Sequence, residues 1–212
     1  MAAIDPLARP STPTEARARE VLERFATPAL VNHSLRSAVW AAAYAAEHGI
    51  AHDAELLYVA AMLHDIGLTP SFDAHAVPFE TAGGHVGWVL AAGAGWPVAR
   101  RDRVVEVIER HMWDSVDPAL DAEGYLLEIA TALDISGRNP DWWPAALRRS
   151  VLAALPRLDL VPEFTACFEA EAARKPTSSA AAAMASGIAG RLADNVLNAE
   201  QATASGRHED AP

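Results

Sequence analysis

The sequence predicts an all-α protein, folded as one bundle of about seven to nine helices. Hydrophobic residues make up 51% of the 212 residues, so the chain can bury a substantial core. Alanine is abundant and runs of β-branched residues are scarce, which favours helix over strand. The 14 Pro and 12 Gly fall between segments of helical periodicity, where they mark helix ends.

Local signals place the helix boundaries in order along the chain. Residues 12–15 form a capping box with proline at the first helical position. Gly49 can end the next helix, and Asp53 can cap the one after it. Pro97 opens a further helix, and Asp117-Pro118 resembles a cap followed by a first-turn proline. We expect helices at about 13–25, 30–48, 54–65, 79–92, 97–111, 118–134, 144–154, 162–173 and 177–200.

The remaining segments define the domain. Residues 1–11 are expected to be flexible and the polar residues 201–212 disordered, which leaves a single domain over 12–200. Residues 66–78 lack periodicity and predict a loop that can act as a lid. The alanine-rich stretch 180–197 can pack on the core or on a second copy of the chain, so a homo-oligomer stays open.

Charge and cysteine content exclude several classes of function. The net charge of −11 repels phosphate backbones, so we expect no nucleic-acid partner. Cys167 is the only cysteine, which rules out an internal disulfide and a thiolate zinc site. Lys175 is the only lysine and lies in a predicted loop, which disfavours a Schiff-base mechanism. We expect a small-molecule substrate in a local pocket.

The chain carries no recognisable targeting or membrane segment. Residues 1–10 have neither a basic start nor an apolar stretch, and no apolar run reaches membrane-spanning length. These features predict a cytoplasmic protein without a membrane partner.

Candidate metal ligands lie on three predicted helices. His64 and Asp65 end a segment that is apolar on nearly every side, where buried polar groups are costly unless they are satisfied. His33 shares a helix face with aromatic residues, and Asp134 lies among apolar residues late in another helix. Each could be an ordinary core hydrogen-bonding residue. Because helical bundles build metal sites from inward-facing side chains on facing helices, one shared cation explains all four together.

The order His33, His64-Asp65 and Asp134 resembles the H…HD…D signature of the HD-domain metal-dependent hydrolases. Residues 32–36, 61–68 and 79–83 are similar to the NHSxR, LLHDIG and FExxG motifs of the cyanamide-hydratase-like branch. The resemblance covers about 30–136 and implies an all-α HD domain around one or two divalent cations. It implies His33, His64, Asp65 and Asp134 as metal ligands. Zinc is expected first, with iron, manganese or nickel as alternatives.

Four further residues are candidates for the site. By the same resemblance, His111 would line the pocket, although it could simply favour a helix C-terminus. Arg36 could neutralise an anionic substrate, orient a ligand carboxylate, or lie on the surface. Glu80 could act as an outer acid or a substrate contact. His85 lies one turn beyond the position at which two-metal members place a histidine, which makes a second metal doubtful.

The expected mechanism is attack by metal-bound hydroxide on a small molecule, with Asp65 orienting the nucleophile or taking its proton. In one version the substrate resembles a nitrile or cyanamide and is hydrated. In the alternative, a phosphohydrolase acts on a small phosphate ester or nucleotide, with His111 and Arg36 stabilising the anion. A di-iron oxygenase and a metal-free binding or regulatory protein remain further alternatives. The motifs favour hydration.

Overall fold

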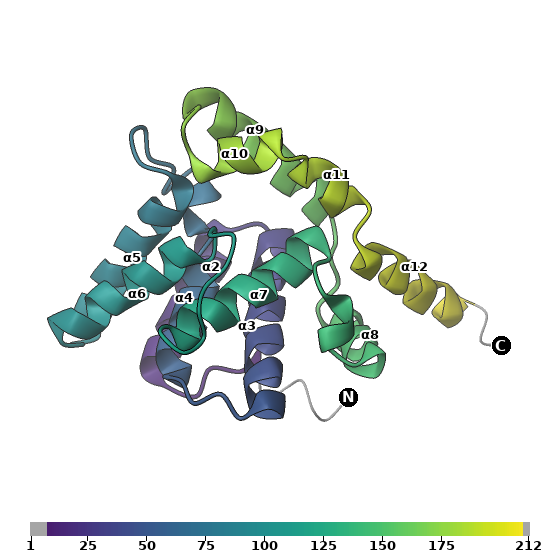
Figure 1. Cartoon of the computed structure of the whole chain (residues 1–212), viewed down its shortest axis with the longest axis horizontal. Helices are drawn as coiled ribbons and strands as arrows, with labels where there is room; N and C mark the ends of the chain where they lie inside the picture. Colours follow the sequence, from purple (N-terminus) through teal and green to yellow (C-terminus); the bar gives the residue numbers. More distant parts are fainter. Residues whose placement is uncertain (1–7, 210–212) are drawn as a thin grey trace.

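The computed structural model describes residues 8–209 of the chain, with side chains through residue 202. It is an all-α structure without strands in this range, as predicted. Figure 1 shows a body of helices with a second group of helices arched over one end of it. The helices of the body are α2 (Pro13–Phe25), α3 (Pro28–His48), α4 (Ala54–Leu63), α5 (Phe79–Gly93), α6 (Val98–Arg110) and α7 (Ala122–Ser136). The rest of the chain forms α8 (Ala145–Ala154), α9 (Leu160–Arg174), α10 (Ser179–Ala185), α11 (Ile188–Ala193) and α12 (Val196–Glu209).

Most predicted boundaries agree with the structure, and capping explains why. The side chain of Thr12 accepts a hydrogen bond from the backbone of Glu15, and that of Asp53 accepts one from Leu56. Gly49 ends α3 with a φ of 63°, a conformation that glycine adopts without strain. Of the predicted loop 66–78, residues Ile66–Leu68 form a 3₁₀ turn, η1.

Two stretches differ from prediction. Helix α7 starts at Ala122, not near residue 118, because Asp121 caps it by accepting a hydrogen bond from Gly124. Asp117 instead accepts a hydrogen bond from Ala119 in a local turn. The predicted helix at 177–200 is split into α10, α11 and α12 at Gly187, which has a φ of 84°, and at Asn195.

The ends of the chain are only partly described. Most of the predicted flexible segment 1–11 lies outside the described residues, as do residues 210–212. Helix α12 continues to Glu209, into the stretch expected to be disordered.

The core centres on α4, which every other helix of the body packs around. Residues 56–63 of α4 are all buried, and α4 contacts α2, α3, α5, α6 and α7. Burial on all sides matches the apolar composition of this helix. No helix of the described residues is long and apolar enough to cross a bilayer.

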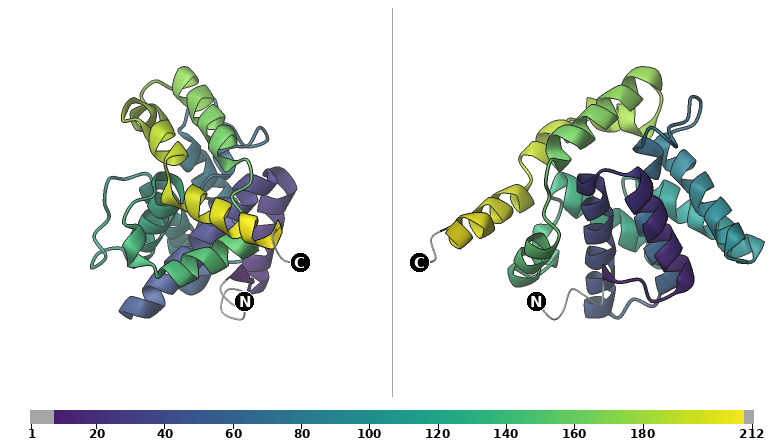
Figure 2. Two further views of the ribbon diagram at one scale, coloured as in Figure 1. Left: turned by 90° about the vertical axis from the view of Figure 1, so that its right-hand side faces the viewer. Right: turned by 180° about the vertical axis from the view of Figure 1, so that it is seen from behind.

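A second apolar cluster joins the arch to the body. Phe79 and Ile135 from the body pack with Phe164 and Phe168 of α9 and with Leu192 of α11. Figure 2 shows from two further sides that α9, α10 and α11 lie across the end of the body, while α12 extends away from it and lies near α8. We call residues 157–201 the C-terminal cover.

Candidate metal centre and its cavity

Helix ends bring the candidate ligands together beneath the C-terminal cover. His33 lies in α3, His64 is the residue that ends α4, and Asp65 precedes η1. Helix α5 can approach this point closely because Gly83 has no side chain. A Cβ atom at Gly83 would lie 2.7 Å from the carbonyl oxygen of Leu63. A larger residue there would push α5 away from the turn that carries His64 and Asp65.

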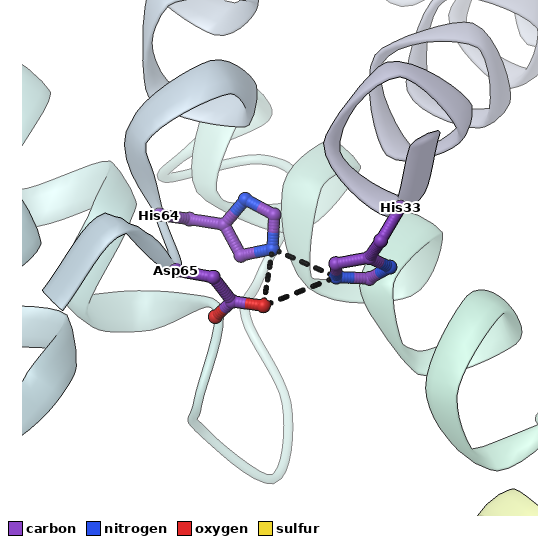
Figure 3. A group of neighbouring side chains, drawn as sticks. All are labelled: His33, His64 and Asp65. Atoms are coloured by element: carbon purple, nitrogen blue, oxygen red, sulfur yellow. Dashed lines mark hydrogen bonds and ion pairs between the residues drawn. The ribbon is translucent and has the colours of Figure 1, made fainter. Parts of the chain in front are cut away.

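His33, His64 and Asp65 converge on one point, as Figure 3 shows. The Nε2 atoms of His33 and His64 are 3.0 Å apart. Oδ2 of Asp65 lies 3.2 Å from Nε2 of His33 and 3.3 Å from Nε2 of His64. All three residues are buried.

Hydrogen bonds elsewhere on the rings indicate which nitrogen carries the proton when both rings are neutral. Nδ1 of His33 donates to Oδ2 of Asp134 at 2.7 Å, and Nδ1 of His64 donates to the carbonyl of Ala61 at 2.8 Å. In the neutral imidazole the other nitrogen, Nε2, is then an acceptor. Two acceptor lone pairs therefore face each other across 3.0 Å. A cation between them turns this repulsion into two coordinate bonds.

Asp65 supports the same interpretation. Neither carboxylate oxygen of this buried residue has a hydrogen-bond partner among the described residues. A buried carboxylate that is ionised and lacks hydrogen bonds is costly unless a cation neutralises it. The donor set of two imidazole nitrogens and one carboxylate suits a divalent transition metal such as zinc.

Asp134 occupies a different position from the one predicted. Its carboxylate lies on the Nδ1 side of His33, away from the Nε2 atoms, and it does not join the group of potential ligands. It accepts hydrogen bonds from Nε and Nη2 of Arg36, both at 2.8 Å, and from Nε1 of Trp40 at 3.0 Å. Direct coordination by Asp134 therefore stays a prediction, and in this arrangement its carboxylate contacts His33 instead. It orients His33, in the carboxylate–histidine arrangement common behind metal sites.

Arg36 does not contact the cavity. It is fully buried, and besides Asp134 it donates to the carbonyls of Leu155 and Pro156 at 3.0 and 3.1 Å. Although burial opposes it, this guanidinium holds the pKa of Asp134 well below the usual range. Of the three alternatives for Arg36, orientation of a site carboxylate agrees with the structure, whereas neutralising a substrate or lying on the surface does not.

The three other candidates, His111, Glu80 and His85, differ in their position relative to the cavity. His111 lines the cavity as expected, with Nε2 3.6 Å from Oδ1 of Asp65 and Nδ1 donating to the carbonyl of Ile108. Glu80 is buried and accepts a hydrogen bond from Ser179 at 2.6 Å, but it does not line the cavity, so it is not placed to contact substrate. His85 is exposed and belongs neither to the cavity lining nor to the group of potential ligands. The described residues therefore offer one group of metal ligands, without a second histidine set.

A cavity of about 700 Å³ opens from the metal-ligand group. Its floor is formed by His33, His64, Asp65 and His111. The cover contributes much of the rest, including the stacked rings of Phe164 and Phe168, whose centroids are 4.5 Å apart. The ring of Phe164 lies 5.9 Å from that of His33. An apolar wall therefore borders the imidazoles.

Two residues behind the site carried no signal in the sequence. Nη1 of Arg157 donates to the carbonyl of Asp134 at 2.8 Å. Nδ2 of Asn195 lies 3.0–3.2 Å from the carbonyls of Leu133, Asp134 and Ile135, at the C-terminal end of α7. Arg157 lies in the turn between α8 and α9, and Asn195 lies between α11 and α12. The last carbonyls of a helix have no partner within the helix, so the sequence indicates that donors are needed there. It does not indicate which residues supply them.

Comparisons with known proteins agree with this geometry. The family model for the HD domain matches residues 30–135, which include all the predicted ligands. Cyanamide hydratase DDI2 of Saccharomyces cerevisiae is 32% identical over 171 residues, which cover 79% of this chain and 76% of the yeast protein. Cyanamide hydratase DDI3 of the same yeast gives the same identity and coverage.

Proposed function

Because the chain belongs to the HD-domain family of metal-dependent hydrolases and hydratases, we propose that it hydrates the C≡N bond of a nitrile- or cyanamide-like small molecule. The observation that carries this proposal is the facing pair of Nε2 atoms beside the unpartnered carboxylate of Asp65. His33, His64 and Asp65 would hold a divalent cation, with zinc expected first. When bound, such a cation polarises the substrate and lowers the pKa of a water molecule from about 15.7 towards about 7.

Side chains around the potential ligands would transfer protons and exclude water. Asp65 has a second oxygen, Oδ1, directed towards Nε2 of His111 at 3.6 Å, so this pair can hold and relay a proton next to the reacting atoms. Hydration forms one C–O bond to the carbon of C≡N and delivers two protons to its nitrogen, which yields an amide. We assign delivery of a proton to that nitrogen to His111, because it lines the cavity beside Asp65. Phe164 and Phe168 exclude bulk water on the neighbouring side.

Charge placement favours a neutral substrate over a phosphate ester. Arg36, expected to neutralise an anion, is fully engaged with Asp134 and two carbonyls behind the site. Two arginines, Arg138 and Arg191, line the cavity but do not belong to the group of potential ligands. Arg138 contacts Glu128, and Arg191 contacts Ser186. A phosphoryl group at the ligands would instead meet the carboxylate of Asp65.

The proposal is tested with zinc-loaded protein and a panel of cyanamide, acetonitrile, 4-nitrophenyl phosphate and nucleoside monophosphates. We expect urea from cyanamide or an amide from the nitrile, and no phosphate release. The variant His64→Ala should be inactive, whereas the matched control His85→Ala, at an exposed position, should retain activity. A fully active His64→Ala protein, or activity confined to the phosphate esters, would overturn the proposal.

A further inference from the structure

The cavity is much larger than the smallest substrates of the proposed reaction. Cyanamide has three non-hydrogen atoms, and a water-sized group occupies about 30 Å³ in a liquid. Such a molecule would fill on the order of a tenth of the roughly 700 Å³ available. Cavities of about 300–1,000 Å³ are typical of sites that enclose ligands of drug-like size. A substrate of three atoms would leave most of this cavity filled with water.

The chemistry of the walls indicates what fills the remaining space. Next to the imidazoles, the rings of Phe164 and Phe168 are buried and stacked, and Ile135 lies on the same lining. Alanines of α7 and α10 add small apolar groups that leave room between the walls. Aromatic rings bind other aromatic rings well in stacked and edge-on arrangements. This part of the cavity therefore suits a flat apolar group attached to the reacting group.

Polar side chains occupy other parts of the lining. Arg191 donates to the carbonyl of Ser186 at 2.5 Å and to its hydroxyl at 3.1 Å, and Arg138 is paired with Glu128. A guanidinium has five N–H donors, more than these contacts use. Polar groups of this kind usually fix the orientation of a ligand whose body lies on apolar walls.

We propose that the preferred substrate is an aryl- or arylalkyl-substituted nitrile or cyanamide, whose aromatic body lies against Phe164 and Phe168. This inference rests on the proposed hydration and specifies its substrate class. In the reaction, R–C≡N and one water give R–C(=O)NH₂: the oxygen of water bonds to carbon, and its two protons pass to nitrogen. The substituent R takes no part in the chemistry and contributes binding within the cavity.

The test compares phenylacetonitrile with acetonitrile, which has the same reacting group without the ring. We expect kcat/KM for phenylacetonitrile to be higher by at least about tenfold, since even small apolar groups in a fitted pocket give discrimination of that order. Ala182 lines the cavity from α10 and is exposed enough to accept a larger side chain. In Ala182→Trp the preference should disappear, so that kcat/KM for phenylacetonitrile falls to that for acetonitrile. The matched control is Ala185→Trp, on the same helix but outside the cavity lining, which should keep the preference.

The outcomes separate the two proposals. If acetonitrile or cyanamide is hydrated but phenylacetonitrile is no better, the substrate class is wrong and the proposed hydration stands. The same conclusion follows if Ala182→Trp keeps the preference. If no nitrile or cyanamide is hydrated by the zinc-loaded protein, the proposed function fails, and the inference that rests on it fails too.

Discussion

The metal-ligand group and the C-terminal cover are built in different ways. His33 lies in the long helix α3, and His64 and Asp65 directly follow the buried helix α4. Each imidazole is held by a hydrogen bond to a buried acceptor. The cover surrounds the cavity with short helices, such as α10 and α11, that expose many of their residues. The body thus holds the reacting groups rigidly, whereas the cover shapes the space above them. We infer that chemistry depends on the first region and substrate choice mainly on the second.

The two regions are not fully independent, because residues of the cover also contact the end of α7 behind the site. Arg157 and Asn195 both bond to the backbone of Asp134, whose carboxylate orients His33. Arg157 is buried, and desolvation lowers its pKa to about 10 despite the nearby carboxylate of Asp134. The cover therefore also stabilises the end of α7 from which a supporting residue of the metal site projects.

The largest effect should follow from removing a ligand. Asp65→Ala should lower kcat/KM by at least about 10³-fold, because water without a cation keeps a pKa near 15.7 rather than about 7. Steady-state kinetics of the zinc-loaded variant measure this loss. Ala182→Trp, in the cover, should lower kcat/KM for cyanamide far less. Equal losses in the two variants would contradict the division between body and cover.

A smaller effect should follow from changing Asp134, which contacts Nδ1 of His33 from outside the group of potential ligands. Asp134→Asn should weaken zinc binding about 10–100-fold, the usual cost of losing a partner behind a metal ligand. It should also lower the free energy of unfolding by about 3–5 kcal/mol, since the buried charge of Arg36 loses its partner. Chelator competition and urea denaturation measure the two quantities. The control Trp40→Phe removes one hydrogen bond to the ionised carboxylate of Asp134 and should cost about 1.5–3 kcal/mol. Unchanged zinc affinity in Asp134→Asn would remove its role in orienting His33.

Asn195 tests how strongly the cover stabilises the body. Asn195→Ala removes the donor that serves three carbonyls at the end of α7 and should cost about 1–3 kcal/mol of unfolding free energy. Asn195→Asp should cost more, because a carboxylate would face those carbonyl oxygens. Urea denaturation of the metal-free proteins gives both values. Equal stability of the two variants and the wild type would show that α7 does not depend on this contact.

The smallest effect is expected at the outer side of the cover. Arg174 is 41% exposed and pairs with Asp73 at 2.6 Å. Arg174→Ala should change the unfolding free energy by no more than about 1 kcal/mol, because exposed ion pairs contribute little. Zinc affinity should stay unchanged in the same chelator competition. A weakened metal site in this variant would mean that the loop carrying Asp73 is coupled to the ligands.

Helix positions were largely predictable because local signals set them. The capping box at residues 12–15, Gly49 and Asp53 act over one turn of chain, and the structure confirms all three. Helix α7 was misplaced at its start, since Asp117 and Asp121 are equally plausible caps by composition. The split of the predicted helix at 177–200 depends on packing of α10 and α11 against α9, which periodicity does not report.

The sequence predicted which residues come together at the candidate site, but not which of them face the cavity and which lie behind it. Periodicity and motif order brought His33, His64 and Asp65 together, and the structure places them within reach of one another. They could not show that Asp134 contacts the Nδ1 side of the His33 ring, since that depends on how two helices pack. Arg157 and Asn195 lie in turns far along the chain, so no spacing rule connects them with Asp134.

Metal analysis of the purified protein, reconstituted with zinc and freed of excess by gel filtration, tests most directly whether residues 33, 64 and 65 hold a cation. We expect about one equivalent per chain in the wild type and in His85→Ala, and on the order of a tenth or less in Asp65→Ala and His64→Ala. X-ray absorption of the wild-type sample should show imidazole nitrogen among the zinc ligands. A wild-type chain that retains no metal, or ligand variants that retain a full equivalent, would contradict the proposed centre.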